Sequence, residues 1–358
     1  MAADDMEDVD VATKAPESDA QEQAPAQASK ATEGGSNPAT EDSSTEPTAS
    51  PKGEISPLAG IDTYISKPPF YPSQPAKLLL LLSPGTGIRS ANNQRLADLW
   101  AEKGYVVFMP DQFNNDPAPT FESLEEASGG EALDAAAAAA TPSFLDRLKL
   151  GLVETAKSFR IDMWLARHTP ATVLPRLLAV VGAAKEMFAD AVAFGGGVYG
   201  AGYCFGGRYV LLLLSELPDD VVAGQRDVGA AVAEKKGAEG DETAYEGAVK
   251  SEEGMVGRGP WIKAGVLAHA TGVGKDDFVG LKEGGRLGIV AVKDDGMFTD
   301  EVRGFGVAMA KDKGLTVEER VWEGVPHGFA VVGEYKDPKI VQAQKEAFDT
   351  MTAFLEKS

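Results

Sequence analysis

The only cysteine of this chain, Cys204, lies in a pattern that suits a nucleophile. It stands at the centre of residues 202–206, Gly-Tyr-Cys-Phe-Gly, between an apolar strand pattern over 198–203 and a helical pattern that follows. A turn of this kind needs glycine on both sides, because a Cβ there would collide with the neighbouring backbone. It also places the sulfur at the positive end of the next helix, which favours a thiolate. We predict a nucleophilic thiol; a buried structural cysteine is the alternative.

A nucleophile of this kind needs a base, and the chain has three histidines. His327 lies in the loop between the last strand pattern and the terminal helical pattern. His269 ends a strand pattern, and His168 ends a helical pattern, where the helix dipole favours a cation. From this order along the chain we predict that His327 is the base, that His269 lines the pocket and that His168 has a structural role.

A carboxylate should orient the base, and two candidates follow the strand pattern Leu287 to Val292. Asp294 and Asp295 are adjacent in the segment VKDDGMF. A carboxylate there can accept the Nδ1 proton of His327, which fixes the tautomer and stabilises the imidazolium. Position alone leaves either aspartate open, but the order nucleophile, acid, histidine is the one that a catalytic triad on such a sheet requires.

Six segments of the chain carry a resemblance to a known family. In their expected order, and over roughly residues 53 to 357, the chain resembles the dienelactone hydrolase family through LLLLLSPGTGI, GYVVFMPDQF, GAGYCFGGRY, VLAHATG, VKDDGMF and PHGFAV. The resemblance implies a triad of Cys204, Asp295 and His327. It favours Asp295 over Asp294 because Asp295 precedes Gly-Met-Phe.

The resemblance also implies how the site is lined. The oxyanion donors would be the backbone amides of Phe205 and, in the SPGTG loop, most probably Gly85. We expect side chains from the same loops to line the pocket, namely Pro84, Thr86, Tyr203, His269 and Phe298.

The chain departs from the family at positions that bind substrate. Members that act on dienelactones carry an acidic residue in the first loop, where this chain has Pro84 or a neighbour. They also carry arginines where this chain has Asn115, and Val331 or Val332. A lactone bearing a carboxylate therefore has no obvious anchor, and we expect the chemistry to be kept while the substrate is changed.

The elements that must position these residues follow an alternating pattern. Short apolar segments alternate with helical patterns, which predicts a mostly parallel sheet covered by helices on both faces, the α/β-hydrolase fold. The expected strands are Ile61 to Ile65, Leu78 to Leu82, Tyr105 to Met109, Val198 to Tyr203, Ile262 to His269, Leu287 to Val292 and Leu315 to Trp322, and the clearest helices are Ala91 to Lys103, Thr172 to Met187 and Pro338 to Glu356.

Composition divides the chain into regions. Residues 1–52 are polar and acidic and lack any aromatic residue, which predicts a disordered tail. Residues 53–358 form the hydrolase-like domain. Within it we expect a helical cap at about residues 114–190 and a charged surface loop at about 224–259.

The charge of the chain bears on its partners and location. The formal net charge is -21 over 358 residues, which argues against binding to nucleic acid or to an anionic membrane surface. The acidic N-terminus differs from a basic targeting peptide, so we expect a cytoplasmic protein. No cluster of residues has metal-ligand spacing and no nucleotide-binding motif is complete, so we expect neither a metal nor a cofactor.

The sequence thus predicts a cysteine-dependent hydrolase that cleaves an ester, lactone or thioester of a small molecule through an acyl-enzyme on Cys204. Two alternatives stay open. One is a non-catalytic binding protein on the same fold, and the other is an acyltransferase or carbon–carbon bond hydrolase on the same scaffold.

Overall fold

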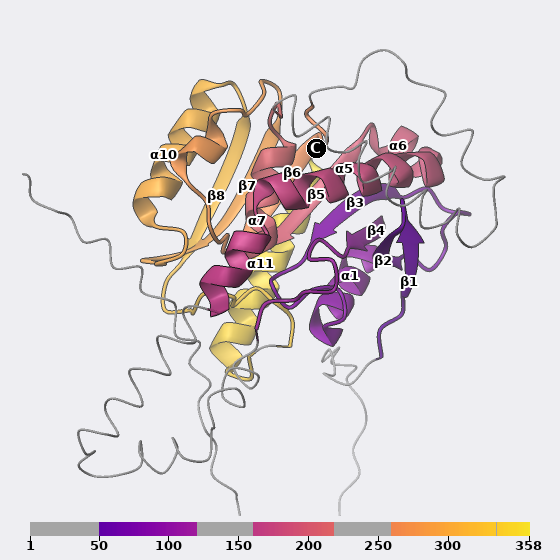
Figure 1. Ribbon diagram of the computed structural model, residues 1–358, viewed down its shortest axis with the longest axis horizontal. Helices are drawn as coiled ribbons and strands as arrows, with labels where there is room; N and C mark the ends of the chain where they lie inside the picture. Colours follow the sequence, from indigo (N-terminus) through magenta and orange to yellow (C-terminus); the bar gives the residue numbers. More distant parts are fainter. Residues whose placement is uncertain (1–49, 120–159, 218–258, 334) are drawn as a thin grey trace, which may run out of the picture. The chain divides into compact units, whose positions relative to one another are not determined.

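A single eight-stranded sheet forms the centre of the folded unit. The computed structural model describes residues 50–119, 160–217, 259–333 and 335–358. In this part of the chain the strand order is β1-β2-β4-β3-β5-β6-β7-β8 (Figure 1). The strands are β1 (Glu54–Leu58), β2 (Ile61–Ser66), β3 (Lys77–Leu82), β4 (Tyr105–Pro110), β5 (Val198–Tyr203), β6 (Ala264–Ala268), β7 (Arg286–Val292) and β8 (Thr316–Trp322).

The sheet is mostly parallel, as predicted. Strands β3 to β8 run parallel to one another, whereas β1 pairs antiparallel with β2, and β2 pairs antiparallel with β4. Strand β1 was not expected, because its residues 54–58 are largely exposed and lack an apolar run. Strand β1 is held by its antiparallel pairing with β2, in which Glu54 lies opposite Ile65.

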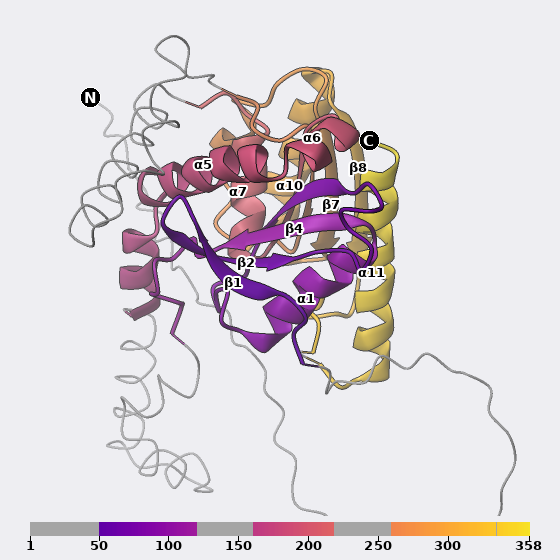
Figure 2. The ribbon, with the colours of Figure 1, turned by 90° about the vertical axis from the view of Figure 1, so that its right-hand side faces the viewer.

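Helices cover both faces of the sheet. The side chains of alternate strand residues point to opposite faces. Leu78, Leu80 and Leu82 belong to a core cluster that includes residues of α5, α7 and α10, while Leu79 and Leu81 belong to one that includes residues of α1 and α11. Figure 2 shows α5 and α6 on one side of the sheet and α1 on the other. The helices are α1 (Ala91–Glu102), α5 (Pro170–Met187), α6 (Ala189–Gly195), α7 (Phe205–Leu213), α10 (Asp300–Asp312) and α11 (Pro338–Glu356), with a short 3₁₀ helix η1 (Lys275–Phe278).

The region expected as a cap is described only in part. Residues 120–159 lie outside the described residues, and residues 160–167 are helical. Helix α5, which also falls in the expected cap, packs into the main core through Val173, Leu177 and Val180. This helix is therefore a layer of the fold itself.

The boundaries of the other expected regions can be compared only at their edges. Residues 1–49 of the acidic tail and residues 224–258 of the charged loop lie outside the described residues. The folded unit includes residues 50–52, because the Lys52 N–H donates to Asp98 Oδ2 at 2.7 Å. Within the described ranges, no helix combines the length and the apolar character that crossing a membrane requires.

Candidate active site

Cys204 occupies a sharp turn between β5 and α7. Its backbone angles are φ 50° and ψ -117°, a positive φ that costs energy for any residue with a side chain. An added Cβ on Gly202 would collide with the carbonyl of Gly206, and one on Gly206 would collide with the carbonyl of Leu82. The two glycines are therefore required by the close approach of the backbone, as the motif predicts.

The loop that follows β6 holds Cys204 from the other side. The Cys204 N–H donates to Ala268 O at 3.0 Å, and the Thr271 N–H donates to Cys204 O at 3.0 Å. His269 lies between these two contacts with a positive φ of 36°. Ala270 packs closely on Gly207, because a Cβ added to Gly207 would lie only 2.8 Å from the Cβ of Ala270. The position of the thiol is thus set by two separate strands of the sheet.

A chain of side-chain contacts connects the thiol with a buried carboxylate. Cys204 Sγ lies 3.2 Å from Thr271 Oγ1, which lies 3.1 Å from His327 Nε2. On the other side of the ring, His327 Nδ1 lies 2.8 Å from Asp295 Oδ2. Because a carboxylate only accepts hydrogen bonds, Nδ1–H must donate to Asp295, and Nε2 faces the thiol.

The structure distinguishes the two adjacent aspartates. The Asp295 side chain is only 3% exposed, and its second oxygen accepts the Met297 N–H at 2.9 Å. Asp294 is exposed and has a positive φ of 57°. Only Asp295 contacts His327, so the acid that the resemblance favours is the one that the structure brings to the histidine.

The electrostatics of these groups favour a charged thiol and histidine. Burial alone would raise the pKa of Cys204, but hydrogen bonds with His327, Thr271 and the Phe205 N–H lower that pKa below its usual value. Burial would lower the pKa of His327, but Asp295 and Cys204 raise it to about 9. The hydrogen bond from His327 outweighs burial for Asp295 too and lowers its pKa. The site therefore stabilises a thiolate–imidazolium pair.

Comparison with known proteins shows which family this chain resembles. The model of the dienelactone hydrolase family matches residues 61–225, which include the whole turn around Cys204. Over these residues the chain is similar to the dienelactone hydrolase family. Hydrolase pyvD of Aspergillus violaceofuscus is 24% identical over 297 residues, covering 83% of this chain and 86% of pyvD. Hydrolase tropI of Talaromyces stipitatus is 24% identical over 298 residues, covering 83% of this chain and 87% of tropI.

Solved structures share the α/β-hydrolase fold with this chain. A protein of Klebsiella pneumoniae subsp. pneumoniae, provisionally described as a dienelactone hydrolase, superposes with a TM-score of 0.51 at 14% identity, covering 86% of this chain and 98% of its own. The thermophilic esterase Est2 of Thermogutta terrifontis gives a TM-score of 0.50 at 13% identity, covering 84% and 91%.

The loop expected to supply the second oxyanion donor is held at several points. Gln112 Nε2 donates to Ser83 O at 2.8 Å, and Asn93 Nδ2 donates to Gly87 O at 2.7 Å. Between them, Gly85 O accepts the Ala118 N–H at 2.8 Å. The backbone amide of Gly85 thus belongs to a rigid loop at the carboxyl end of β3.

The residues expected to line the pocket fall into two groups. Thr86 is exposed, and its hydroxyl accepts a hydrogen bond from Asn93. Pro84, Tyr203 and Phe298 are buried. Tyr203 and Phe298 also belong to the core clusters, and Tyr203 accepts a hydrogen bond from Trp100. A pocket-lining role for these residues stays a prediction.

His269 lies behind the site. Its side chain is fully buried, and its ring meets the His327 ring edge-on at a centroid distance of 5.1 Å. Burial holds the pKa of His269 well below its usual value, so the ring is neutral. His269 thus packs against the ring of His327, and its predicted role as a pocket-lining residue stays a prediction.

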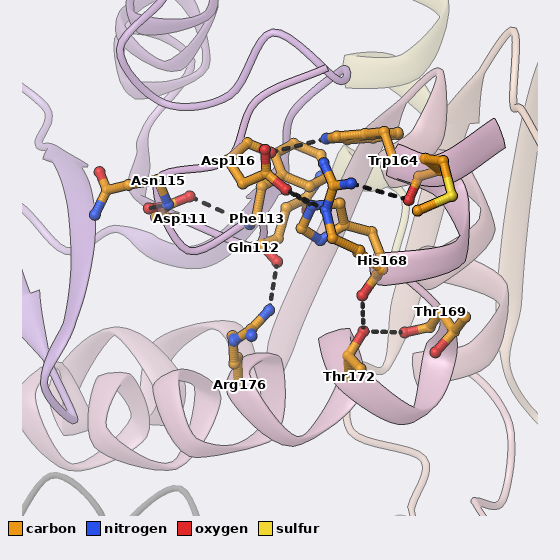
Figure 3. A network of polar contacts seen from close by, with 12 residues as sticks. Asp111, Gln112, Phe113, Asn115, Asp116, Trp164, His168, Thr169, Thr172 and Arg176 are labelled. Carbon is orange, nitrogen blue, oxygen red and sulfur yellow. Dashed lines mark hydrogen bonds and ion pairs between the residues drawn. The ribbon is translucent and has the colours of Figure 1, made fainter. Parts of the chain in front are cut away.

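A second polar network lies beside the turn of Cys204, between the loop after β4 and the helical residues 160–167 (Figure 3). His168 Nε2 lies 3.0 Å from Asp116 Oδ2, and Arg167 Nε donates to the same oxygen at 2.9 Å. Trp164 Nε1 donates to Asp116 O at 2.8 Å, and its ring packs on Phe205 at 5.1 Å. The network braces an aromatic cluster against the first residue of α7.

The substrate-binding departures noted from the sequence can be located. Asn115 is exposed, and its side-chain oxygen accepts from Arg89 at 3.3 Å. Val331 is buried and Val332 is half-buried. Among the residues that the structure describes, no group of three His, Cys, Asp or Glu side chains is placed to hold a metal ion.

Sequence reasoning missed Thr271. Its hydroxyl lies within hydrogen-bond distance of both Cys204 and His327, but a threonine three residues after the end of β6 carries no pattern of its own. The one available signal was its position in the segment HATG, directly after the strand that ends beside β5.

Proposed function

We propose that this chain is a cysteine-dependent hydrolase that cleaves an ester, lactone or thioester of a small molecule through an acyl-enzyme on Cys204. The observation that supports it is the contact chain from Cys204 through Thr271 and His327 to the buried Asp295, built on a strained turn. The similarity to proteins named hydrolases and the match to the dienelactone hydrolase family favour the same reaction class.

The first half of the proposed reaction is acylation. The Cys204 thiolate attacks the substrate carbonyl carbon, and the carbonyl oxygen becomes an oxyanion that accepts hydrogen bonds from the Phe205 and Gly85 amides. When the tetrahedral intermediate collapses, the carbon–oxygen bond to the leaving group breaks. The His327 imidazolium gives its Nε2 proton to the departing alkoxide, so that a neutral alcohol and a thioester on Cys204 result.

The second half is deacylation by water. Neutral His327 accepts a proton from a water molecule as that water attacks the thioester carbonyl. Collapse of the second tetrahedral intermediate breaks the carbon–sulfur bond and releases the carboxylic acid. The thiolate is regenerated beside the His327 imidazolium, and Asp295 stabilises that cation throughout.

The expected substrate differs from that of the dienelactone-cleaving relatives. Neither Asn115 nor Val331 carries a charge that could bind a substrate carboxylate, and Arg89, which contacts Asn115, also forms an ion pair with Asp62 at 3.0 Å. We therefore expect uncharged esters or lactones to be preferred over carboxylate-bearing ones.

The decisive measurement compares hydrolysis of short p-nitrophenyl esters and a small lactone panel by wild type and Cys204→Ala. We expect wild-type turnover and a loss of at least about 10³-fold in Cys204→Ala, because the nucleophile is removed. Wild-type protein alkylated by iodoacetamide should be equally inactive, since the chain contains no other thiol.

Two results would count against the proposal. Equal turnover by wild type and Cys204→Ala would exclude Cys204 as the nucleophile. Slow alkylation of the native protein, becoming fast only after unfolding, would indicate a structural thiol and favour a binding protein on this fold.

A further inference from the structure

The hydroxyl of Thr271 lies between the two groups that must exchange a proton. Thr271 Oγ1 is 3.2 Å from Cys204 Sγ and 3.1 Å from His327 Nε2. The residue is buried, with 8% of its surface exposed. Its other polar contact is Met297 Sδ at 3.9 Å, a weak acceptor. The hydroxyl is therefore committed to the thiol and the imidazole.

The backbone fixes where this hydroxyl lies. The Thr271 N–H donates to Cys204 O, while the Cys204 N–H donates to Ala268 O, so the loop after β6 is bound on both sides of the nucleophile. The positive φ of His269 turns the chain back toward Cys204 between these two contacts. The same contacts that set the thiol thus also set the Thr271 side chain.

A hydroxyl in this position suits the charged form of the site. A threonine hydroxyl has one proton to donate and two lone pairs to accept with. In the thiolate–imidazolium form, the His327 Nε2–H donates to Oγ1 while the Oγ1–H donates to Sγ. In the neutral form, the Sγ–H donates to Oγ1 and the Oγ1–H donates to Nε2. In going between the two forms the Sγ–H bond breaks and an Nε2–H bond forms, and the hydroxyl keeps one proton.

We propose that Thr271 is a positioning residue whose hydroxyl bridges Cys204 and His327 and stabilises the thiolate–imidazolium form of the pair. Hydrogen bonds to ionised groups are stronger than those between neutral groups. The bridge is therefore worth more to the charged form than to the neutral form. The proposal rests on the nucleophilic role of Cys204 in the proposed function, but it is testable without substrate.

Other titratable groups near this bridge are few in the described part of the chain. Asp295 contacts the far side of the His327 ring, and the neutral His269 ring packs on its edge. Both are unchanged by a substitution at Thr271. A shift in the titration of the thiol on such a substitution is therefore attributable to the bridge.

The experiment is a titration of the single thiol in the full chain. Thiolate absorbance and the iodoacetamide rate are measured against pH for wild type, Thr271→Val and Thr271→Ser. Thr271→Ala guards against a steric effect of the methyl group that valine adds. Thr172→Val, the same change at a hydroxyl that donates to the carbonyls of Arg167 and Thr169, serves as the matched control.

We expect a wild-type midpoint below that of an ordinary thiol. Thr271→Val and Thr271→Ala should raise the midpoint and slow alkylation at neutral pH by about tenfold or more, because a hydrogen bond to a charged group is lost. Thr271→Ser should stay near wild type because it keeps the hydroxyl. Thr172→Val should match wild type.

Three results would overturn the bridge. They are an ordinary midpoint in the wild type, an unchanged midpoint in both Thr271→Val and Thr271→Ala, or a shift in Thr271→Ser as large as in Thr271→Val, which would assign the effect to shape. If the wild type hydrolyses no ester while Thr271→Val still raises the midpoint, the bridge stands and the proposed hydrolysis fails.

Discussion

Two histidine–aspartate pairs of similar geometry lie in this protein, and their electrostatics differ. His327 and Asp295 are 2.8 Å apart, and His168 and Asp116 are 3.0 Å apart. The pKa of His327 is raised to about 9. Burial, opposed by Asp116, holds the pKa of His168 below its usual value. One pair therefore favours an imidazolium, and the other holds a neutral ring.

The difference arises from what surrounds each pair. The Asp295 side chain is 3% exposed, and the other nitrogen of His327 faces Thr271 and Cys204. Asp116 is 43% exposed and shares its carboxylate oxygen with Arg167. The Nδ1 of His168 is buried without a hydrogen-bond partner. Two histidine–aspartate contacts of similar length thus differ because the second ring nitrogen of His327 has a polar partner and that of His168 has none.

The strongest way to break this comparison is to remove each carboxylate in turn. We expect Asp295→Asn to lower kcat by about 10³- to 10⁴-fold, because the amide no longer stabilises the imidazolium or holds the reactive tautomer. The matched change Asp116→Asn should retain most of the turnover. Steady-state hydrolysis of the best ester from the panel measures both. Similar losses in the two variants would show that the pairs are not functionally distinct.

The pH dependence of turnover sharpens the contrast. Because the pKa of His327 is raised to about 9, the imidazolium that protonates the leaving group persists through neutral pH and is lost above that value. We expect kcat/KM for an alkyl ester or lactone to fall by about tenfold per pH unit beyond it.

A p-nitrophenyl ester provides the control for this profile, because its leaving group departs without a proton and should show a weaker decline. In Asp295→Asn the decline should begin at lower pH. A decline near neutral pH in the wild type would contradict the raised pKa of His327.

The smallest effect is expected at the neutral pair and concerns stability. The folded chain resists protonation of His168, whose pKa is lowered, whereas the unfolded chain takes up that proton below the ordinary value of 6.5. Stability is therefore lost as the pH falls below 6.5, and His168→Gln should make this loss smaller. Urea unfolding at several pH values measures the change.

Some acid sensitivity should remain in His168→Gln, because the pKa of the buried His269 is lowered as well. An unaltered pH dependence of the unfolding free energy would indicate that His168 is already protonated in the folded state.

The elements that could be predicted from sequence are those whose residue pattern fits only one type of secondary structure. Leu78 to Leu82 is buried on both faces, which is typical of a central parallel strand. Strand β1 escaped prediction because an edge strand with exposed side chains is defined by its pairing with β2. Helix α10 was not predicted because it contains two glycines, which disfavour a helix. One of them, Gly306, allows the helix to pack directly against Phe278.

The site was predictable where chain order carries information. Cys204, Asp295 and His327 each follow a strand in the required sequence, and the structure brings them together. The position of Tyr203 in the core could not be predicted, because the register of β5 decides which side of the sheet a strand side chain faces. Thr271 depends on a turn at His269 that no residue pattern encodes.

The positions of the turn around Cys204 differ in how far they tolerate substitution. Gly202 and Gly206 lie against backbone atoms, so no side chain can be added at either position without moving a strand. The side chain of Cys204 is not confined in this way, because it points away from the turn toward Thr271. Substitution is therefore far more restricted at the two glycines than at the residue that they flank.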